Sequence, residues 1–127
     1  ARAGTAIVVT DSGNHSFKVE LADTPKARAR GLMFRRELAP DAGMLFDFKQ
    51  AGPVAFWMKN TYISLDMIFI RKDGRVHRIE RGTEPFSERV IASQGNVAAV
   101  LEVAAGVSDE IGLRAGDRIY HKFFAGK

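Results

Sequence analysis

The stretch VAFWMKNTYISLDMIFI, residues 54–70, places a lysine and an asparagine between two of the most apolar segments of the chain. If residues 54–61 form a strand, Trp57 and Lys59 point to the same side, since side chains alternate along a strand. An indole beside an ammonium group suits a ligand that combines a flat apolar surface with a negative charge. The pattern therefore predicts a binding site at this segment.

Two carboxylates interrupt apolar strands, Asp66 in SLDMIFI and Glu102 in VLEVA. A buried carboxylate is tolerated only when it is paired or hydrogen-bonded, so Asp66 is expected to have a charged or backbone N–H partner. Lys59 and Arg30 are the candidate cations. The alternative for both carboxylates is a purely structural role in a turn or an ion pair. The predicted ligand-binding residues, which would border one cleft, are Arg30, Trp57, Lys59, Asn60 and Asp66.

An enzymatic role is the main functional alternative. Asp66 and Glu102 in one cleft could serve as acid and base in a small hydrolase that acts on an envelope glycan or a related polymer. The chain has no glycine-rich phosphate loop, no GxSxG elbow and no HExxH motif, and its three histidines show no ligand-like spacing. These observations favour a binding or accessory module over an enzyme, with no cofactor and no metal expected.

Two other binding chemistries, copper and nucleic acid, are less well supported by the sequence. The four methionines could bind Cu(I) through their thioethers, but methionine among Leu, Phe and Ile is more often core filler. The basic residues of segment 26–36, with Trp57, are groups that a single-strand nucleic-acid binder uses, yet the net charge is only +4 and no module signature is present. Nucleic acid is therefore disfavoured, and the expected partner is an anionic small molecule, glycan or peptide. The methionines are Met33, Met44, Met58 and Met67.

Short strands must position these residues. Two β-rich runs flank the turn residues Asp11-Ser12-Gly13-Asn14, which predicts a hairpin over residues 5–21. A second hairpin is predicted over residues 65–81 around Asp73-Gly74. Its first strand carries apolar side chains on both faces, which is typical of a central strand that is covered on both sides. Further strands are predicted after Gly43, over residues 96–106 and over residues 117–124.

Two short helices complete the prediction. Thr24 as N-cap, Pro25 in the first turn and Gly31 as a stop signal predict a helix of one or two turns. Leu32, Met33 and Phe34 are expected to anchor it to the core. A single helical turn capped by Ser108 follows the strand at 96–106. Seven or eight short strands with two short helices indicate a β-rich α+β domain, with the sheet curled into a small half-open barrel.

Size and composition agree with one domain over residues 1–127. The apolar fraction of 46% and the charged fraction of 27% are ordinary for a globular protein, and no apolar run approaches the length of a membrane helix. The chain has no cysteine, which excludes disulfides and thiolate sites. It begins ARAGTAIVV without methionine, which would follow signal-peptide removal or truncation, and we expect a periplasmic or secreted location.

Several segments together resemble the DUF192 family, also called UPF0127, of small bacterial and archaeal proteins. The resemblance covers nearly the whole chain, in order and at plausible spacing. It implies a compact β-rich domain, often made with a signal peptide, and no established activity. The segments are RGLMFRREL at 30–38, GMLFDF at 43–48, FWMKNTYISLDMIFI at 56–70, GRV at 74–76, VLEVAAG at 100–106 and GD at 116–117.

Overall fold

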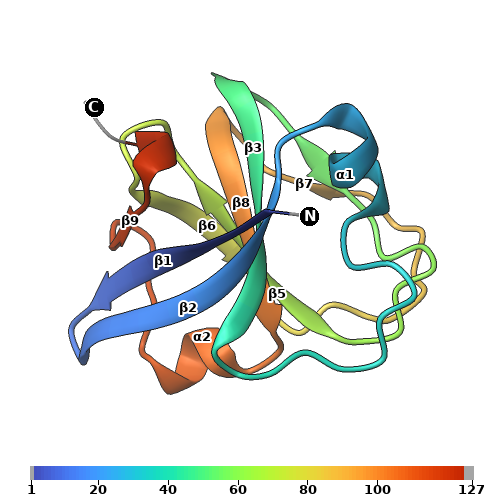
Figure 1. Ribbon diagram of the computed structural model, residues 1–127, viewed down its shortest axis with the longest axis horizontal. Helices are drawn as coiled ribbons and strands as arrows, with labels where there is room; N and C mark the ends of the chain where they lie inside the picture. The colour runs from blue at the N-terminus through green and yellow to red at the C-terminus, as the bar shows by residue number, and fades with distance from the viewer. Residues whose placement is uncertain (1, 125–127) are drawn as a thin grey trace.

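A strongly curled sheet of seven strands forms the frame of the protein in the computed structural model, which describes residues 2–124 (Figure 1). The strand order is β6-β5-β8-β3-β2-β1-β9, and a small second sheet pairs β4 with β7. The predicted β-rich α+β fold with a half-open barrel is confirmed. The strands are β1 (Arg2–Thr10), β2 (Gly13–Ala22), β3 (Ala42–Gly52), β4 (Ala55–Phe56), β5 (Leu65–Ile70), β6 (Val76–Glu80), β7 (Ile91–Ala92), β8 (Val97–Ala104) and β9 (Arg118–Tyr120).

Both predicted hairpins are present. Strands β1 and β2 pair antiparallel from Arg2 opposite Leu21 to Thr10 opposite Gly13. Strands β5 and β6 form the second hairpin, and every residue of β5 is buried because β8 flanks its other edge and side chains cover both faces. The continuous apolar run of this strand was therefore a correct sign of a central position.

Helix α1 (Pro25–Arg30) connects β2 to β3, which lie parallel and side by side. Thr24 accepts a hydrogen bond from the Ala27 backbone N–H at 3.1 Å, and Gly31 ends the helix with a φ of 51°. Leu32 is buried, as predicted. The expectation that Phe34 anchors the helix is wrong, because the backbone turns there with a φ of 68° and the residue is 53% exposed.

Each strand carries side chains on both faces of the curled sheet, and each face is packed. On one face lies a cluster that includes Leu45, Ile68 and Leu101. On the other face, their sequence neighbours Phe46 and Met67 belong to a second cluster, which α1 covers. The two faces therefore bury separate sets of side chains, and a one-residue step along a strand moves from one set to the other.

The two edge strands of the sheet, β6 and β9, are joined near their ends by a few contacts and not by a continuous ladder of hydrogen bonds. Arg75 forms an isolated bridge with Arg118, and the Val76 backbone N–H donates to the Asp117 carbonyl at 2.8 Å. Strand β9 then ends at Tyr120 and a 3-10 helix (Lys122–Phe124) follows, so the strand predicted over residues 117–124 is shorter than expected.

Two further expectations need correction. The segment 54–61 is not one strand, since β4 covers Ala55–Phe56 only and the chain turns at Asn60 with a φ of 56°. Helix α2 (Val107–Glu110) has Gly106 as its N-cap, and Ser108 lies inside the helix with its hydroxyl directed to a side chain of β5. Within residues 2–124, no helix has the length and apolarity needed to cross a membrane.

Candidate functional site

A cavity of about 270 Å³ lies between α1 and the face of the sheet that α1 covers. The helix and the residues after it supply one wall. Strands β3, β5 and β8 supply the other, and the segment from β4 to Thr61 completes the lining. Most of the lining side chains are apolar or aromatic. The apolar side chains include Leu32, Phe46, Phe48, Phe56, Trp57 and Met58. The ionisable side chains of the lining are Arg28, Arg30 and Glu102.

Glu102 is the acidic group of this cavity. It lies in the middle of β8, directly opposite Met44 of β3 and Met67 of β5, and it is 3% exposed. Burial among these side chains raises the pKa of the Glu102 carboxyl to about 8. At neutral pH the group is therefore chiefly a neutral acid, which has both a hydrogen-bond donor and an acceptor.

The oxygens of Glu102 face the cavity and have no protein partner. No hydrogen bond among residues 2–124 stabilises the carboxyl, and burial is the sole cause of its pKa shift. In the same part of the chain, every fully enclosed side-chain oxygen or nitrogen does have a partner. The Glu102 oxygens must consequently touch the open space of the cavity, where a ligand atom or water could reach them.

Both arginines of the cavity wall lie over aromatic rings. Arg28 donates to the Asp47 carbonyl at 2.9 Å and lies over the ring of Phe48. The Arg30 guanidinium carbon is 5.6 Å from the ring centre of Phe34. Such cation–π contacts hold a charged head near an apolar surface without neutralising it.

Trp57 is an exposed aromatic residue of the cavity wall. The residue is 44% exposed, and the Lys59 ammonium lies 5.1 Å from its ring centre. The predicted neighbourhood of Trp57 and Lys59 is thus present, although it arises in a turn and not along a strand. Lys59 stands beside the cavity without lining it.

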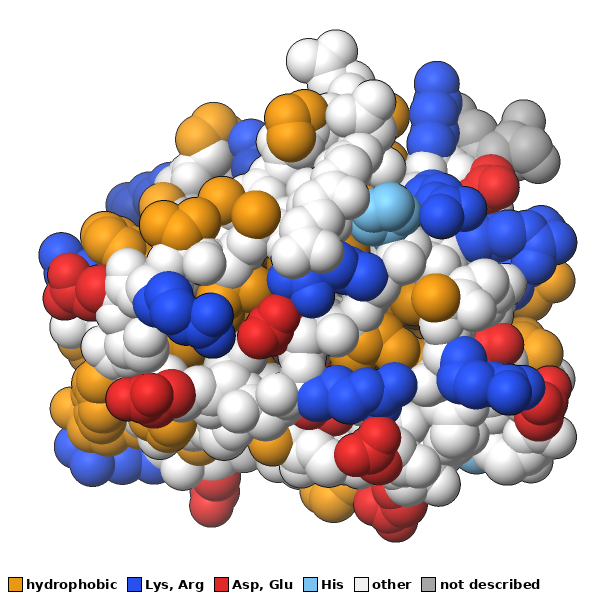
Figure 2. All heavy atoms as spheres, turned by 180° about the vertical axis from the view of Figure 1, so that it is seen from behind, with side chains coloured by type: hydrophobic (Ala, Val, Ile, Leu, Met, Phe, Trp, Pro, Cys, Tyr) orange, Lys and Arg blue, Asp and Glu red, His pale blue; other side chains and the backbone are white. Residues whose placement is uncertain are grey.

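Three loops support this side of the molecule by bonding to one another. The Phe34 N–H donates to the Asn60 carbonyl at 2.9 Å, and the Phe86 N–H donates to the Thr61 carbonyl at 3.1 Å. Phe34, Asn60 and Phe86 all have positive φ angles. Non-glycine residues in this conformation cost about 1–3 kcal/mol each, so the surrounding contacts must hold them. Figure 2 shows hydrophobic side chains gathered among Lys and Arg on the side where these loops lie.

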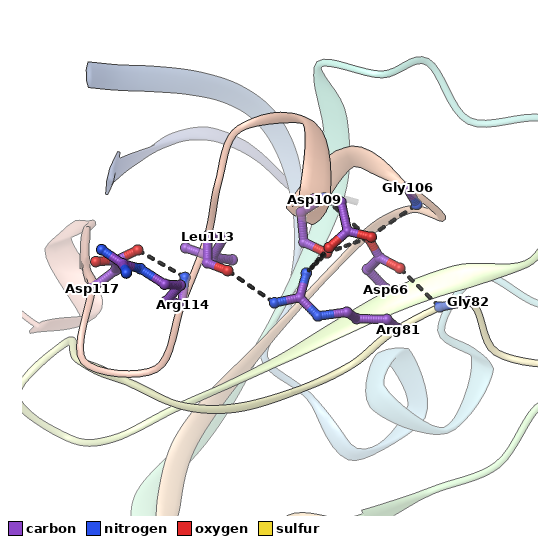
Figure 3. A network of polar contacts seen from close by, with 9 residues as sticks. Asp66, Arg81, Gly82, Gly106, Asp109, Leu113, Arg114 and Asp117 are labelled. Carbon is purple, nitrogen blue, oxygen red and sulfur yellow. Dashed lines mark hydrogen bonds and ion pairs between the residues drawn. The ribbon is translucent and has the colours of Figure 1, made fainter. Parts of the chain in front are cut away.

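Asp66 belongs to a different region (Figure 3). Its carboxylate accepts hydrogen bonds from the backbone N–H groups of Gly82 at 2.9 Å, Gly106 at 3.1 Å and Ser108 at 3.0 Å. The Ser108 hydroxyl also donates to it at 2.6 Å. The prediction of a buried Asp66 with a backbone N–H partner is confirmed, whereas the suggested pairing with Lys59 or Arg30 is wrong. Asp66 instead joins β5 to the start of α2.

The two carboxylates lie on opposite faces of the sheet. Asp66 is directly opposite Val103, the residue after Glu102, so Asp66 and Val103 share a face and Glu102 points to the other. They cannot act as an acid and base pair on one substrate. The hydrolase alternative built on this pair is accordingly not supported by the geometry.

The structure thus separates the residues selected from the sequence. Arg30 and Trp57 line the cavity and Lys59 adjoins it. Asn60 forms the turn beside it and offers its carbonyl to a neighbouring loop. Asp66 lies elsewhere. Sequence reasoning considered Glu102 only as a partner of Asp66 and so missed its place in this cavity, although a lone acid in an apolar strand was the available signal.

Comparisons with known proteins agree with this architecture. The model of the family DUF192, described as "Uncharacterized ACR", matches residues 7–121. A crystal structure of a "putative transcription regulator" from Sinorhizobium meliloti 1021 is similar at 46% identity and a TM-score of 0.93, over 96% of this chain and 95% of that one. A protein of unknown function from Novosphingobium aromaticivorans DSM 12444 is similar at 38% identity and a TM-score of 0.91, over 94% and 85% of the two chains. A search of curated proteins finds no match.

Proposed function

The chain belongs to the DUF192 family, and we propose that it acts as a binding module for a small organic anion. The ligand would place its apolar body in the cavity under α1. Its negative group would lie at the mouth of the cavity, which we define as the region of Arg30 and Lys59. The cavity, at about 270 Å³, is near the lower end of the size range of small-molecule pockets, and its largely apolar wall with a few polar groups is typical of them.

An anionic ligand is supported by two cations near the cavity that have no acidic partner among the described residues. Arg30 and Lys59 rest against aromatic rings, at 5.6 Å and 5.1 Å from the ring centres. Among the ion pairs formed within residues 2–124, none involves either side chain. Both charges are therefore available to an incoming carboxylate or phosphate. A guanidinium can bind such groups through two parallel hydrogen bonds.

Trp57 offers a direct readout, because it is the only tryptophan of the chain and lines the cavity. We suggest titrating the ¹⁵N-labelled protein with hexanoate and benzoate, and in parallel with the neutral amides hexanamide and benzamide, while following the Trp57 indole N–H signal. The anions should shift this signal saturably, and they should bind more tightly than the amides.

The variant R30Q should reduce the preference for the anions. K26Q is the matched control, since Lys26 is exposed on the same helix and does not line the cavity. Equal binding of acids and amides to the wild-type protein, or an equal effect of R30Q and K26Q, would contradict the proposed role of the mouth.

A further inference from the structure

We infer that Glu102 selects the ligand at the inner end of the cavity by donating a hydrogen bond to an uncharged oxygen, so that the ligands are oxo- or hydroxy-substituted carboxylates and not plain fatty or aromatic acids. This inference rests on the proposed function. It names the ligand group that is recognised on the side of the same cavity formed by the sheet. The cations of α1 do not determine this group.

The buried carboxyl of Glu102 lowers the stability of the protein as long as it has no hydrogen-bond partner. A carboxyl group without a hydrogen-bond partner is unfavourable in an apolar core, and a Leu or Met at this position would pack among the same neighbours without that cost. The residues directly opposite Glu102, Met44 and Met67, offer only thioethers, which are weak acceptors. Nothing in the adjoining strands thus satisfies the acid, and the open side is the cavity.

Among residues 2–124, two positive charges and no other charged side chain line the cavity together with Glu102. From α1 the charged lining groups are Arg28 and Arg30, while β3, β5 and the segment 55–61 contribute no titratable side chain to the lining. The two guanidiniums do not draw the carboxyl into its charged form, since burial alone sets its pKa at about 8. Around pH 7 the group presents an O–H to the cavity.

The ligand atom that meets this O–H is an uncharged oxygen. A ligand carboxylate moved to the sheet side would leave water and would lack an adjacent cation, which is costly. A carbonyl or hydroxyl oxygen loses much less on leaving water and can accept the Glu102 proton in a hydrogen bond. The negative group of the ligand then stays with Arg30 at the mouth, and the neutral oxygen meets Glu102.

The matched probes are hexanoate and 5-oxohexanoate, which differ by a carbonyl oxygen near the end remote from the carboxylate. At about pH 6, where Glu102 is protonated, the wild-type protein should bind the oxo acid about tenfold more tightly, as expected for one added hydrogen bond. E102Q should retain this preference, because its amide N–H also donates. E102L should lose it, because its side chain has no hydrogen-bond donor.

Raising the pH gives an independent readout. At about pH 9.5 the wild-type Glu102 is a carboxylate with no proton to donate, so its preference for the oxo acid should disappear, whereas that of E102Q should persist. Comparing these two proteins needs no assumption about the folding of E102L. Equal affinities for the two probes at the lower pH, with the effect of R30Q intact, would overturn this inference and leave the anion site standing. If neither probe shifts Trp57, the proposed function and the inference fail together.

Discussion

Replacing Glu102 by glutamine should remove a pH dependence from the folding stability of the protein. In the folded state burial raises the pKa of Glu102 from 4.5 to about 8, whereas in the unfolded chain the group titrates near its ordinary value. Between these values the folded state binds one more proton than the unfolded state. The free energy of unfolding of the wild-type protein should therefore decrease as the pH rises, by about 1.4 kcal/mol per pH unit for this group.

Over the full interval the effect amounts to roughly 5 kcal/mol, with about 3 kcal/mol of it reached by pH 7. Because E102Q does not titrate, its stability should be close to that of the wild type near pH 5 and should exceed it by roughly 3–5 kcal/mol near pH 9. Relaxation of the cavity around the charged form of Glu102 would bring the difference in stability to the lower end of this range. Urea unfolding followed by fluorescence of Trp57, at several pH values across this range, measures the difference.

The control is E88Q, which removes a carboxylate at an exposed position. It separates the general effect of net charge from the effect of burying Glu102. If the stability curves of wild type and E102Q run parallel from about pH 5 to about pH 9, then Glu102 is ionised in the folded protein at neutral pH and the reasoning on the cavity is refuted.

Four further variants test other parts of the fold by thermal or urea unfolding. D66A should destabilise the protein by a few kcal/mol, because it leaves buried N–H and O–H donors without their acceptor. K59A should lower the stability by less than about 1 kcal/mol. Equal losses of stability in the two variants would make Lys59 a structural residue. G43A should cost roughly 1–3 kcal/mol, since its added methyl would lie 2.5 Å from the Glu102 carbonyl oxygen, and an unchanged stability would mean that β3 and β8 separate easily. T24A should cost about 1 kcal/mol through the lost helix cap.

The sequence allowed the local elements to be predicted because their signals are local. The turn residues between β1 and β2, and Asp73-Gly74 between β5 and β6, identify both hairpins without reference to the rest of the chain. The continuous apolar run of β5 likewise revealed its burial on both faces. The same is true of α1, whose cap Thr24, first-turn Pro25 and stop Gly31 lie within one short segment of the sequence.

The roles of Asp66 and Glu102 could not be separated in the same way. Each is a single acid within an apolar strand, and in sequence they look alike. Their difference depends on the register of β5 against β8, which sends the two side chains to opposite faces. It also depends on donors from Gly82 and Ser108, which are distant from Asp66 in sequence and close to it only in the fold.

The closure of the sheet by β9 also has a consequence for how the chain folds during synthesis. Ile7 pairs with Tyr120, and Gly74 accepts a hydrogen bond from the Ile119 N–H at 2.8 Å. Because these contacts join early and late segments, the barrel should fold slowly, on the order of milliseconds to seconds, as expected for non-local topologies. A nascent chain whose residues after 117 are still inside the ribosome would leave the β1 edge unpaired and the core beneath it uncovered. Such a chain would depend on chaperones to avoid aggregation until β9 emerges.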